Sequence, residues 1–357
     1  MKILVIAKWM VKWNGASKVA YELSKQFKEH GHDVRIIAYG DHIDPDWERE
    51  FTFYRLHNKG LLALPQLRSI VFEYKPDVIH SHDWLGLLVV GQGVPLVSTN
   101  HSNWPMNWFF GLDTFFAGIL QGIPNEIKMH LSDAAISVSK YQQVESSRRH
   151  LQSQVIFNGV DEAYFSLPPE IAKLDSPSLL FVGSVDNRKA KYLLPFIDCL
   201  SKKRENVKLY VIGPAVDNDI VRGLSNYANV VYLGVVDDVR PYYRAADALV
   251  FLSRMEMCPM VLIESVACGL PIVAFDVCSH SEIIEDGKNG FLVREGDIEA
   301  AVSATLELLK SPDLRRDISQ NNINKAKLCF SWSEKAEFYL SLFNKLVYSL
   351  MIKHDAK

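Results

Sequence analysis

The amino-acid sequence predicts an α/β protein built from two open domains in tandem, and three observations support this. The chain has 357 residues, which is too long for one ordinary hydrophobic core and suits two domains. Apolar strand patterns alternate with helical patterns in two separate series, as in parallel sheets covered by helices. Between the series lies the segment 158–178, rich in proline, serine and acidic residues, which predicts a linker.

The first series begins with a continuous apolar run at 2–7, as expected for a central parallel strand. Residues 16–31 follow with apolar side chains at helical spacing, and 32–40 is the next strand. A strand, helix and strand joined by such short loops form a βαβ unit. Further strands of this series are predicted at 76–82, 94–100 and 133–139.

The second series predicts strands at 178–185, 207–214, 229–236, 247–253 and 271–277. In sheets of this kind ligands bind beyond the carboxyl ends of the strands, so functional residues are expected in the loops that follow them. The last segment, 331–354, predicts a long amphipathic helix. From its pattern alone it could equally pack at the end of the fold or form a dimer contact.

Composition and charge exclude several classes of function. With 48% hydrophobic and 23% charged residues the chain is an ordinary globular protein, and its net charge of −3 predicts no nucleic-acid partner. Five cysteines without a C-x-x-C pair predict neither a disulfide framework nor a zinc site. No apolar run approaches the length of a membrane span, so we expect a cytoplasmic protein, at most peripheral to a membrane.

Two glutamates, Glu256 and Glu264, lie on either side of the start of a predicted helix, which Pro259 opens and Gly269 closes. A buried carboxylate is costly unless it is paired. The free N–H groups at a helix N-terminus can bind an anion, and a carboxylate one turn further on suits a diol such as ribose. From spacing alone, Glu264 could instead cap its own helix or pair with a lysine.

The stretch "SRMEMCPMVLIESVACGLPIVAFD" (253–276) resembles the E-x7-E signature of retaining glycosyltransferases of the GT-B fold, in particular glycosyltransferase family 4. Five further segments are similar to that family, in its order along the chain: "NGASKVAYELSKQFKEHGHDV" (14–34), "PDVIHSHDW" (76–84), "VIFNGVDEAYF" (155–165), "FVGSVDNRKAKYLL" (181–194) and "EIIEDGKNGFLV" (282–293). The resemblance covers residues 1–345, and the E-x7-E block is its most specific part.

This resemblance implies two Rossmann-like domains that face each other across a cleft. Residues 1–163 would bind the acceptor, residues 164–333 would bind the nucleotide sugar, and 334–357 would form a helix that crosses back toward the first domain. The implied reaction moves a sugar from a UDP-, GDP- or ADP-sugar to a hydroxyl group of a glycan, a lipid-linked saccharide or a small molecule. It needs neither a metal nor a further cofactor.

The resemblance also implies roles for single residues. Glu264 would bind the ribose hydroxyls, while Glu256 and His101 would contact the transferred sugar. A histidine like His101, at the end of a strand, can also be purely structural. Gly15 would lie in a loop opposite the donor, where the family has two glycines and this chain has Asn14 first. The loop that contacts the sugar and phosphate would comprise Met257, Cys258, Pro259, Met260 and Val261.

A basic turn at 183–191 is the predicted phosphate site. It carries Arg188, Lys189 and Lys191 after a strong strand, and such cations stabilise a departing diphosphate. The family has an arginine directly after the glycine and a lysine five positions on, whereas here Ser184 takes the first place. We infer that Arg188 reaches the same phosphates, although the turn could simply be a solvated basic loop.

Two other clusters admit a functional interpretation. His80, His82 and Asp83 resemble metal ligands in their spacing. His80 and His82 would share one face of a strand, but no third ligand for this pair is evident, and we interpret the pair as part of the acceptor-domain structure. The segment 103–120 carries six aromatic residues, Trp104, Trp108, Phe109, Phe110, Phe115 and Phe116. It could pack as core and lid, or form an acceptor platform whose exposed aromatic residues stack on a sugar or rest at a membrane surface.

Family chemistry suggests front-face displacement, in which the leaving diphosphate helps to deprotonate the acceptor and no enzyme nucleophile is needed, unlike in retaining glycosidases. Two alternatives remain at this point. A nucleotide-sugar epimerase with the same architecture would use carboxylates and histidine as acid and base. A pseudoenzyme subunit would bind a sugar nucleotide without transfer, and the serine at position 184 favours it.

Overall fold

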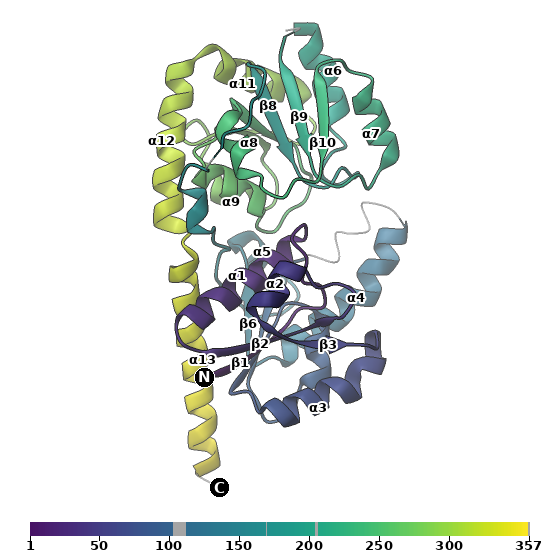
Figure 1. The fold of residues 1–357 in the computed structure, drawn as a ribbon, viewed down its shortest axis with the longest axis vertical. Helices are drawn as coiled ribbons and strands as arrows, with labels where there is room; N and C mark the ends of the chain where they lie inside the picture. Colours follow the sequence, from purple (N-terminus) through teal and green to yellow (C-terminus); the bar gives the residue numbers. More distant parts are fainter. Residues whose placement is uncertain (103–111, 169, 204–205, 356–357) are drawn as a thin grey trace. The chain divides into compact units, whose positions relative to one another are not determined.

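The computed structural model describes residues 1–102, 112–168, 170–203 and 206–355. They form two compact units, coloured along the chain in Figure 1. Unit 1 comprises Met1–Asn158 together with Trp332–Lys357, and unit 2 comprises Gly159–Ser331. The chain therefore leaves unit 1 once and returns to it with its last helix.

Unit 1 contains a sheet of seven parallel strands in the order β3-β2-β1-β4-β5-β6-β7. The strands are β1 (Lys2–Ile6), β2 (Asp33–Tyr39), β3 (Thr52–Leu56), β4 (Val78–Ser81), β5 (Leu96–Asn100), β6 (Ala134–Ser137) and β7 (Gln154–Val155). The strands predicted at 2–7, 32–40, 76–82, 94–100 and 133–139 are confirmed. The sequence missed the two edge strands, because β3 is largely half-exposed and β7 has only two residues.

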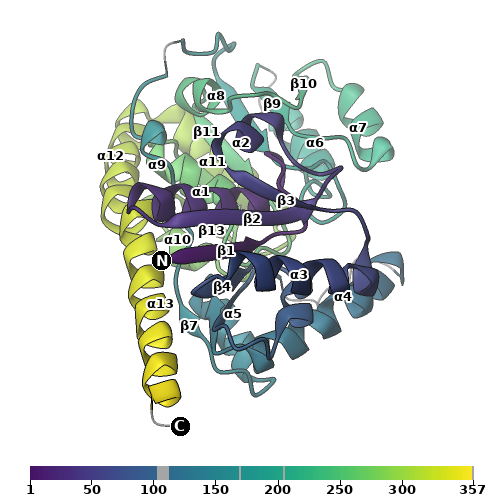
Figure 2. The same cartoon turned by 60° about the horizontal axis from the view of Figure 1, so that its bottom comes forward.

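Helices cover both faces of this sheet. They are α1 (Gly15–Glu29), α2 (Pro45–Glu50), η1 (Gly60–Ala63), α3 (Leu64–Tyr74), η2 (Trp84–Val89), α4 (Leu112–Leu131), α5 (Lys140–Ser147) and α13 (Trp332–Asp355). Figure 2 shows α1 on one side of the sheet and α3 and α4 on the other. Helix α13 packs along α1, and η2 packs against α3 and α4.

Unit 2 contains a second parallel sheet, of six strands, in the order β10-β9-β8-β11-β12-β13. The strands are β8 (Ser178–Val182), β9 (Lys208–Ile212), β10 (Val230–Gly234), β11 (Ala248–Phe251), β12 (Ile272–Phe275) and β13 (Phe291–Val293). All five strands predicted for the second series are present, and the sequence missed only the three-residue edge strand β13. The expected α/β class with two parallel sheets is confirmed.

The helices of unit 2 are η4 (Glu162–Tyr164), α6 (Leu193–Lys203), α7 (Asn218–Ser225), α8 (Arg240–Ala245), α9 (Met260–Ala267), α10 (His280–Ile283), α11 (Ile298–Lys310) and α12 (Pro312–Cys329). Alternate strand residues such as Phe181 and Phe275 pack with Phe196 of α6 and Leu308 of α11 in a fully buried core. Within the described ranges, no helix of either unit is both long and apolar enough to cross a bilayer.

Candidate functional site

Glu256, in the loop after β11, is held by two cations from the loop after β8. Arg188 Nη1 lies 2.7 Å and Lys189 Nζ 3.1 Å from the same carboxylate oxygen, Oε1. Arg188 also donates to the carbonyl of Met255 at 3.0 Å, which fixes the guanidinium beside the loop. Burial alone would raise the pKa of Glu256, but the attraction of Lys189 and Arg188 lowers it to about 2. Glu256 is therefore a carboxylate at any physiological pH.

The turn that carries the two cations is organised by Asp186. Its carboxylate accepts hydrogen bonds from the backbone N–H groups of Arg188 at 2.9 Å and Lys189 at 2.8 Å, and from Ser184 Oγ at 2.6 Å. Ser184 therefore helps to shape the turn at the place where the family has an arginine. Arg188, four residues later, brings its guanidinium to Glu256.

Two glycines set the path of the chain into this turn. Gly183 follows β8 with a φ of 149°, and Gly213 follows β9 with a φ of 139°. A Cβ atom on Gly213 would lie 2.0 Å from the carbonyl oxygen of Gly183, so the two strand ends approach more closely than any side chain allows. This close approach fixes where the turn leaves the sheet.

Glu264 lies in the second turn of α9 and is only 4% exposed. The hydroxyl of Tyr243, from α8, donates to its Oε2 at 3.1 Å. Burial and the neighbouring Glu264 raise the pKa of Tyr243 well above its usual value, so the phenol keeps its hydrogen. Glu264 is thus a buried acceptor whose orientation depends on a neighbouring helix.

The N-terminus of α9 has no side-chain cap. The helix begins at Met260, one residue later than predicted, so Pro259 is its N-cap residue. Pro259 offers no side-chain hydrogen bond. The N–H groups of Leu262 and Ile263 bond to the carbonyl of Pro259. In the preceding loop Met257 and Cys258 are buried, and the first helical residues, Met260 and Val261, are half-buried. Such a terminus is a general binding site for anions.

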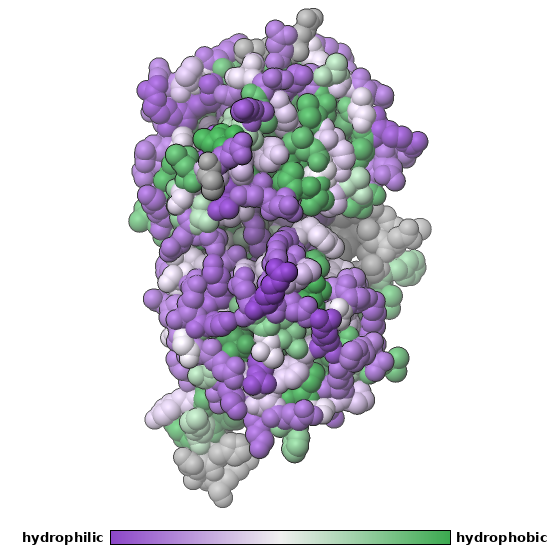
Figure 3. Space-filling view, viewed as in Figure 1, coloured by the Kyte–Doolittle hydropathy of each residue, from purple (hydrophilic) through white to green (hydrophobic). Residues whose placement is uncertain are grey.

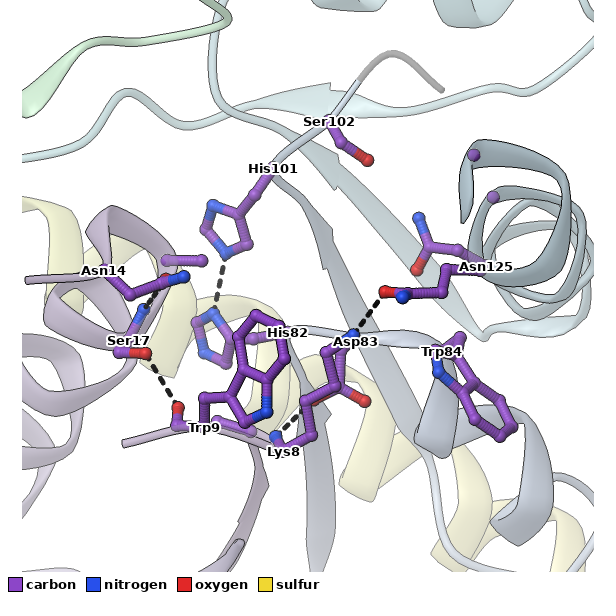
Figure 4. A pocket seen from close by; sticks show the side chains of 15 residues that line it. Lys8, Trp9, Asn14, Ser17, His82, Asp83, Trp84, His101, Ser102 and Asn125 are labelled. Atoms are coloured by element: carbon purple, nitrogen blue, oxygen red, sulfur yellow. Dashed lines mark hydrogen bonds between the residues drawn. The ribbon is translucent and has the colours of Figure 1, made fainter. Parts of the chain in front are cut away.

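Unit 1 contains a cavity of about 280 Å³ at the carboxyl ends of its central strands (Figure 4). His101, directly after β5, lines it, and its Nε2 lies 2.9 Å from Nδ1 of His82, which follows β4. The other lining residues follow β1, β4 or β5, or belong to α1, η2 or α4: Ala7, Lys8, Trp9, Asn14, Ala16, Ser17, His82, Asp83, Trp84, Ser102, Gly118, Gln121, Gly122 and Asn125.

The start of α1 lies beside this cavity. Asn14 caps the helix, because its side chain accepts a hydrogen bond from Ser17 N at 3.1 Å. Asn14, Ala16 and Ser17 line the cavity, whereas Gly15 is exposed and does not. The residue in place of the family's first glycine therefore has a structural role as a helix cap.

Buried charges hold the floor of the cavity together. The carboxylate of Asp83 accepts hydrogen bonds from the backbone N–H groups of Lys8 and Leu85. The side chain of Lys8 bonds to Gln121 of α4. Lys128, fully buried, donates to the carbonyl of Asp83 at 2.9 Å, and burial lowers the pKa of this lysine to about 7.

His80 and His82 share one face of the chain at β4, as the strand pattern predicted, with ring centroids 4.3 Å apart. His80 Nε2 lies 2.8 Å from Thr99 Oγ1, so it bonds to the neighbouring strand. In the described part of the chain, no group of three or more His, Cys, Asp or Glu residues could hold a metal ion.

The aromatic segment at 103–120 lies largely outside the described residues. Trp104, Trp108, Phe109 and Phe110, and the side chain of Phe115, lie outside the described residues. The side chain of Phe116 is 59% exposed on α4.

Comparison with known proteins shows the family of this chain. The family model described as "Glycosyltransferase Family 4" matches residues 13–164, and the model described as "Glycosyl transferases group 1" matches residues 176–311. An uncharacterized glycosyltransferase of Methanocaldococcus jannaschii is 30% identical over 362 residues, which cover 94% of this chain and 95% of that protein. The chain is a family 4 glycosyltransferase.

This glycosyltransferase uses a nucleotide-sugar donor and retains the anomeric configuration of the transferred sugar. It is also similar to the N-acetyl-alpha-D-glucosaminyl L-malate synthase of Bacillus anthracis, at 23% identity over 342 residues, with 86% of this chain and 87% of that protein covered. The solved structure of Anabaena Alr3699/HepE in complex with UDP and glucose has the same fold, with a TM-score of 0.81, 18% identity, and coverage of 96% of this chain and 99% of that one.

Three contacts of the candidate site were not predicted from the sequence. Asp186 stands two and three residues before the amides that it binds, which is the spacing of an Asx turn and could have been recognised. The bonds between Tyr243 and Glu264 and between His82 and His101 join different elements. Nothing in the local pattern indicates such contacts.

Proposed function

We propose that unit 2 of this glycosyltransferase binds a UDP-sugar and that unit 1 binds the hydroxyl acceptor. The observation that carries the proposal is the ion triad of Arg188, Lys189 and Glu256. Its carboxylate, Glu256, lies three residues before Pro259, the N-cap of α9, which has no side-chain cap. Two cations and the free N–H groups of a helix terminus are the groups that a diphosphate requires.

In the proposed complex the diphosphate accepts hydrogen bonds from the side chains of Arg188 and Lys189 and from backbone N–H groups in the first turn of α9. Charge-assisted bonds of this kind strengthen as negative charge develops on the leaving group, so they lower the barrier to departure. A diphosphate oxygen then accepts the proton of the acceptor hydroxyl on the same face of the sugar. Glu256, ionised beside both cations, accepts hydrogen bonds from the transferred sugar.

Glu264 is proposed to bind the two ribose hydroxyls. Its burial in α9 and the hydrogen bond from Tyr243 hold the carboxylate in one orientation, so little freedom is lost when ribose binds. The choice of UDP as the first nucleotide to test is supported by Alr3699/HepE, whose structure holds UDP and glucose.

The test is the release of UDP from a UDP-sugar, measured with and without an acceptor. The donors UDP-, GDP- and ADP-glucose are first compared by thermal shift, because a ligand at 100 times its Kd stabilises the protein by about 2.7 kcal/mol. UDP release that depends on the acceptor supports the proposal. Stabilisation by GDP- or ADP-glucose alone would overturn the choice of base.

The cavity of unit 1 is proposed to hold a saccharide acceptor. Trp9 and Trp84 offer flat apolar faces for sugar rings, and Ser102, Gln121 and Asn125 offer hydroxyl and amide groups for sugar hydroxyls (Figure 4). His101 lies at the same cavity and is proposed to contact the transferred sugar. An acceptor panel of free saccharides, lipid-linked saccharides and L-malate would identify the class.

A lipid-linked acceptor is favoured by the outer face of α4. Five large apolar side chains follow one stripe of this helix and are each at least 41% exposed: Phe116, Leu120, Ile123, Ile127 and Leu131. Green atoms at the edge of unit 1, where Figure 1 places α4, show part of this apolar surface in Figure 3. The same helix contributes Gln121 and Asn125 to the cavity, so an interfacial α4 would bring a lipid-linked saccharide close to it.

Ion pairs adjoin this stripe. Arg149, which follows α5, pairs with Glu126 of α4 at 3.0 Å, and Arg148 pairs with Glu145 of α5. Because these arginines are paired, the apolar side chains of the stripe would supply most of the contact with a lipid surface.

Flotation with anionic phosphatidylglycerol vesicles tests this membrane contact. Leu120→Glu should reduce the bound fraction severalfold, because a charge replaces an inserted side chain. Leu328→Glu is the matched control, since Leu328 is 78% exposed on α12 of unit 2. Equal flotation of the wild type and both variants would contradict the membrane contact. A change of sedimentation in Leu120→Glu alone would assign the stripe to self-association instead.

A further inference from the structure

His82 and His101 share one hydrogen bond through their rings. Nδ1 of His82 lies 2.9 Å from Nε2 of His101, and the rings are nearly parallel, with an interplanar angle of 11°. Burial lowers the pKa of His101 to about 3 and that of His82 well below its usual value, so both imidazoles are neutral. A neutral imidazole has one N–H and one lone pair, so one ring must donate and the other must accept.

The second nitrogen of His82 decides which ring donates. Its Nε2 is buried and has no hydrogen-bond partner among the described residues. A buried N–H without a partner is rarer in proteins than a buried acceptor without one, because the unpaired donor loses its bond to water. The lone pair of His82 therefore belongs on Nε2 and the hydrogen on Nδ1, from where it is donated to His101.

This assignment fixes the state of His101. Because its Nε2 accepts from His82, its hydrogen lies on Nδ1, at the other edge of the ring. Figure 4 shows the ring with Nε2 directed at His82 and the second nitrogen turned away from it. We propose that His82 is a positioning residue that holds His101 in the Nδ1–H tautomer, so that His101 presents a hydrogen-bond donor to the oxygen atoms of the transferred sugar.

A second layer of residues keeps His82 in place. The ring of His80 packs on it, with centroids 4.3 Å apart, and is tied through Thr99 to the hydroxyl of Tyr339 on α13. The Nδ1 of His80 is also buried without a partner among the described residues, so the same reasoning places its hydrogen on Nε2, facing Thr99 at 2.8 Å. His80 and His82 thus each direct their single ring N–H at a neighbouring acceptor.

Two substitutions separate the hydrogen bond of His82 from its packing. His82→Asn keeps a donor, because the amide nitrogen of asparagine is bonded to Cγ, as Nδ1 is in histidine. His82→Phe keeps a ring between its neighbours but has no donor. The tautomer of His101 is read from the ¹⁵N shifts of histidine-labelled protein without substrate, with His101→Gln used to assign its signals.

We expect the hydrogen of His101 on Nδ1 in the wild type and in His82→Asn, and a mixture of tautomers in His82→Phe. The role toward the sugar rests on the proposed function, and its readout is kcat for sugar transfer. His82→Phe should lower kcat roughly tenfold, the effect of one lost hydrogen bond, with little change in KM for the donor, while His82→Asn should stay near the wild type.

Two outcomes would overturn the inference. A hydrogen on Nε2 of His101 in the wild type would refute the tautomer, whatever the activity shows. Equal losses of kcat in the Asn and Phe variants would leave His82 only a packing role. If His82→Phe does not fold, as judged by thermal unfolding, the wild-type and His82→Asn spectra still decide. If His101→Gln transfers sugar normally while the tautomer is found as expected, the proposed function of His101 fails and the tautomer stands.

Discussion

Replacing Glu256 with glutamine tests the ion triad that it forms with Arg188 and Lys189. Burial raises the pKa of this carboxyl, but the two cations outweigh burial and lower it from 4.5 to about 2. The side chain is only 15% exposed, so solvent screens the pairs weakly. By linkage, the difference between the two pKa values corresponds to about 3 kcal/mol of folding stability.

The sign of this contribution follows from the direction of the shift. Because the pKa of Glu256 is lower in the folded protein, the stabilisation is fully present above about pH 4.5 and is lost as the pH falls toward 2. Glutamine has no charge to lose. Glu256→Gln should therefore be less stable than the wild type by up to about 3 kcal/mol at pH 7, and the two should converge near pH 2.

Urea unfolding at pH 7 and at pH 3 measures this difference. All seven tryptophans lie in the two stretches of unit 1, so their fluorescence reports unit 1, whereas hydrogen exchange in β8 and β11 reports unit 2. Glu299→Gln is the matched control, because Glu299 forms an exposed ion pair with Lys203 in the same unit. Solvent screens exposed ion pairs, so they contribute little to stability and this control should change little at either pH.

Two results would refute the reasoning. An equal loss of stability at pH 7 and pH 3 would show that the charge of Glu256 is not its source. A loss no larger than that of Glu299→Gln would show that the triad behaves like a surface pair.

Three further predictions concern the donor site. Lys189→Ala should reduce transfer by orders of magnitude while the wild type keeps its activity in excess EDTA, because Arg188 and Lys189 are proposed to supply the positive charge at the diphosphate. Loss of activity on chelation, restored by manganese, would contradict this. Glu264→Ala should fold and lose UDP binding by calorimetry, and Glu264→Gln should bind more weakly than the wild type, because a neutral acceptor replaces a charged one; normal binding by either variant would argue against the ribose contact. Tyr243→Phe should weaken UDP binding by roughly tenfold, through the lost hydrogen bond that orients Glu264, and an unchanged Kd would leave Tyr243 a packing role only.

The sequence by itself determined the fold class and the larger part of both sheets. The apolar runs 3–7 and 179–182 identify central strands, because residues buried on both faces of a sheet are mostly apolar. The edge strands β3, β7 and β13 escaped because they are short or half-exposed, so burial imposes little pattern on them. The positions of Glu256 and Glu264 relative to the start of α9 could also be predicted, because both belong to one local segment.

Only the tertiary structure decided which groups meet. Arg188 and Glu256 are 68 residues apart and make contact because β8 and β11 are neighbours in the sheet. Tyr243 reaches Glu264 from a separate helix, and His101 reaches His82 because β4 pairs with β5. Periodicity depends on neighbours in sequence, whereas these contacts depend on strand order and helix packing. The residue types of the site are therefore readable from the chain, but their partners, pKa values and tautomers follow from the fold.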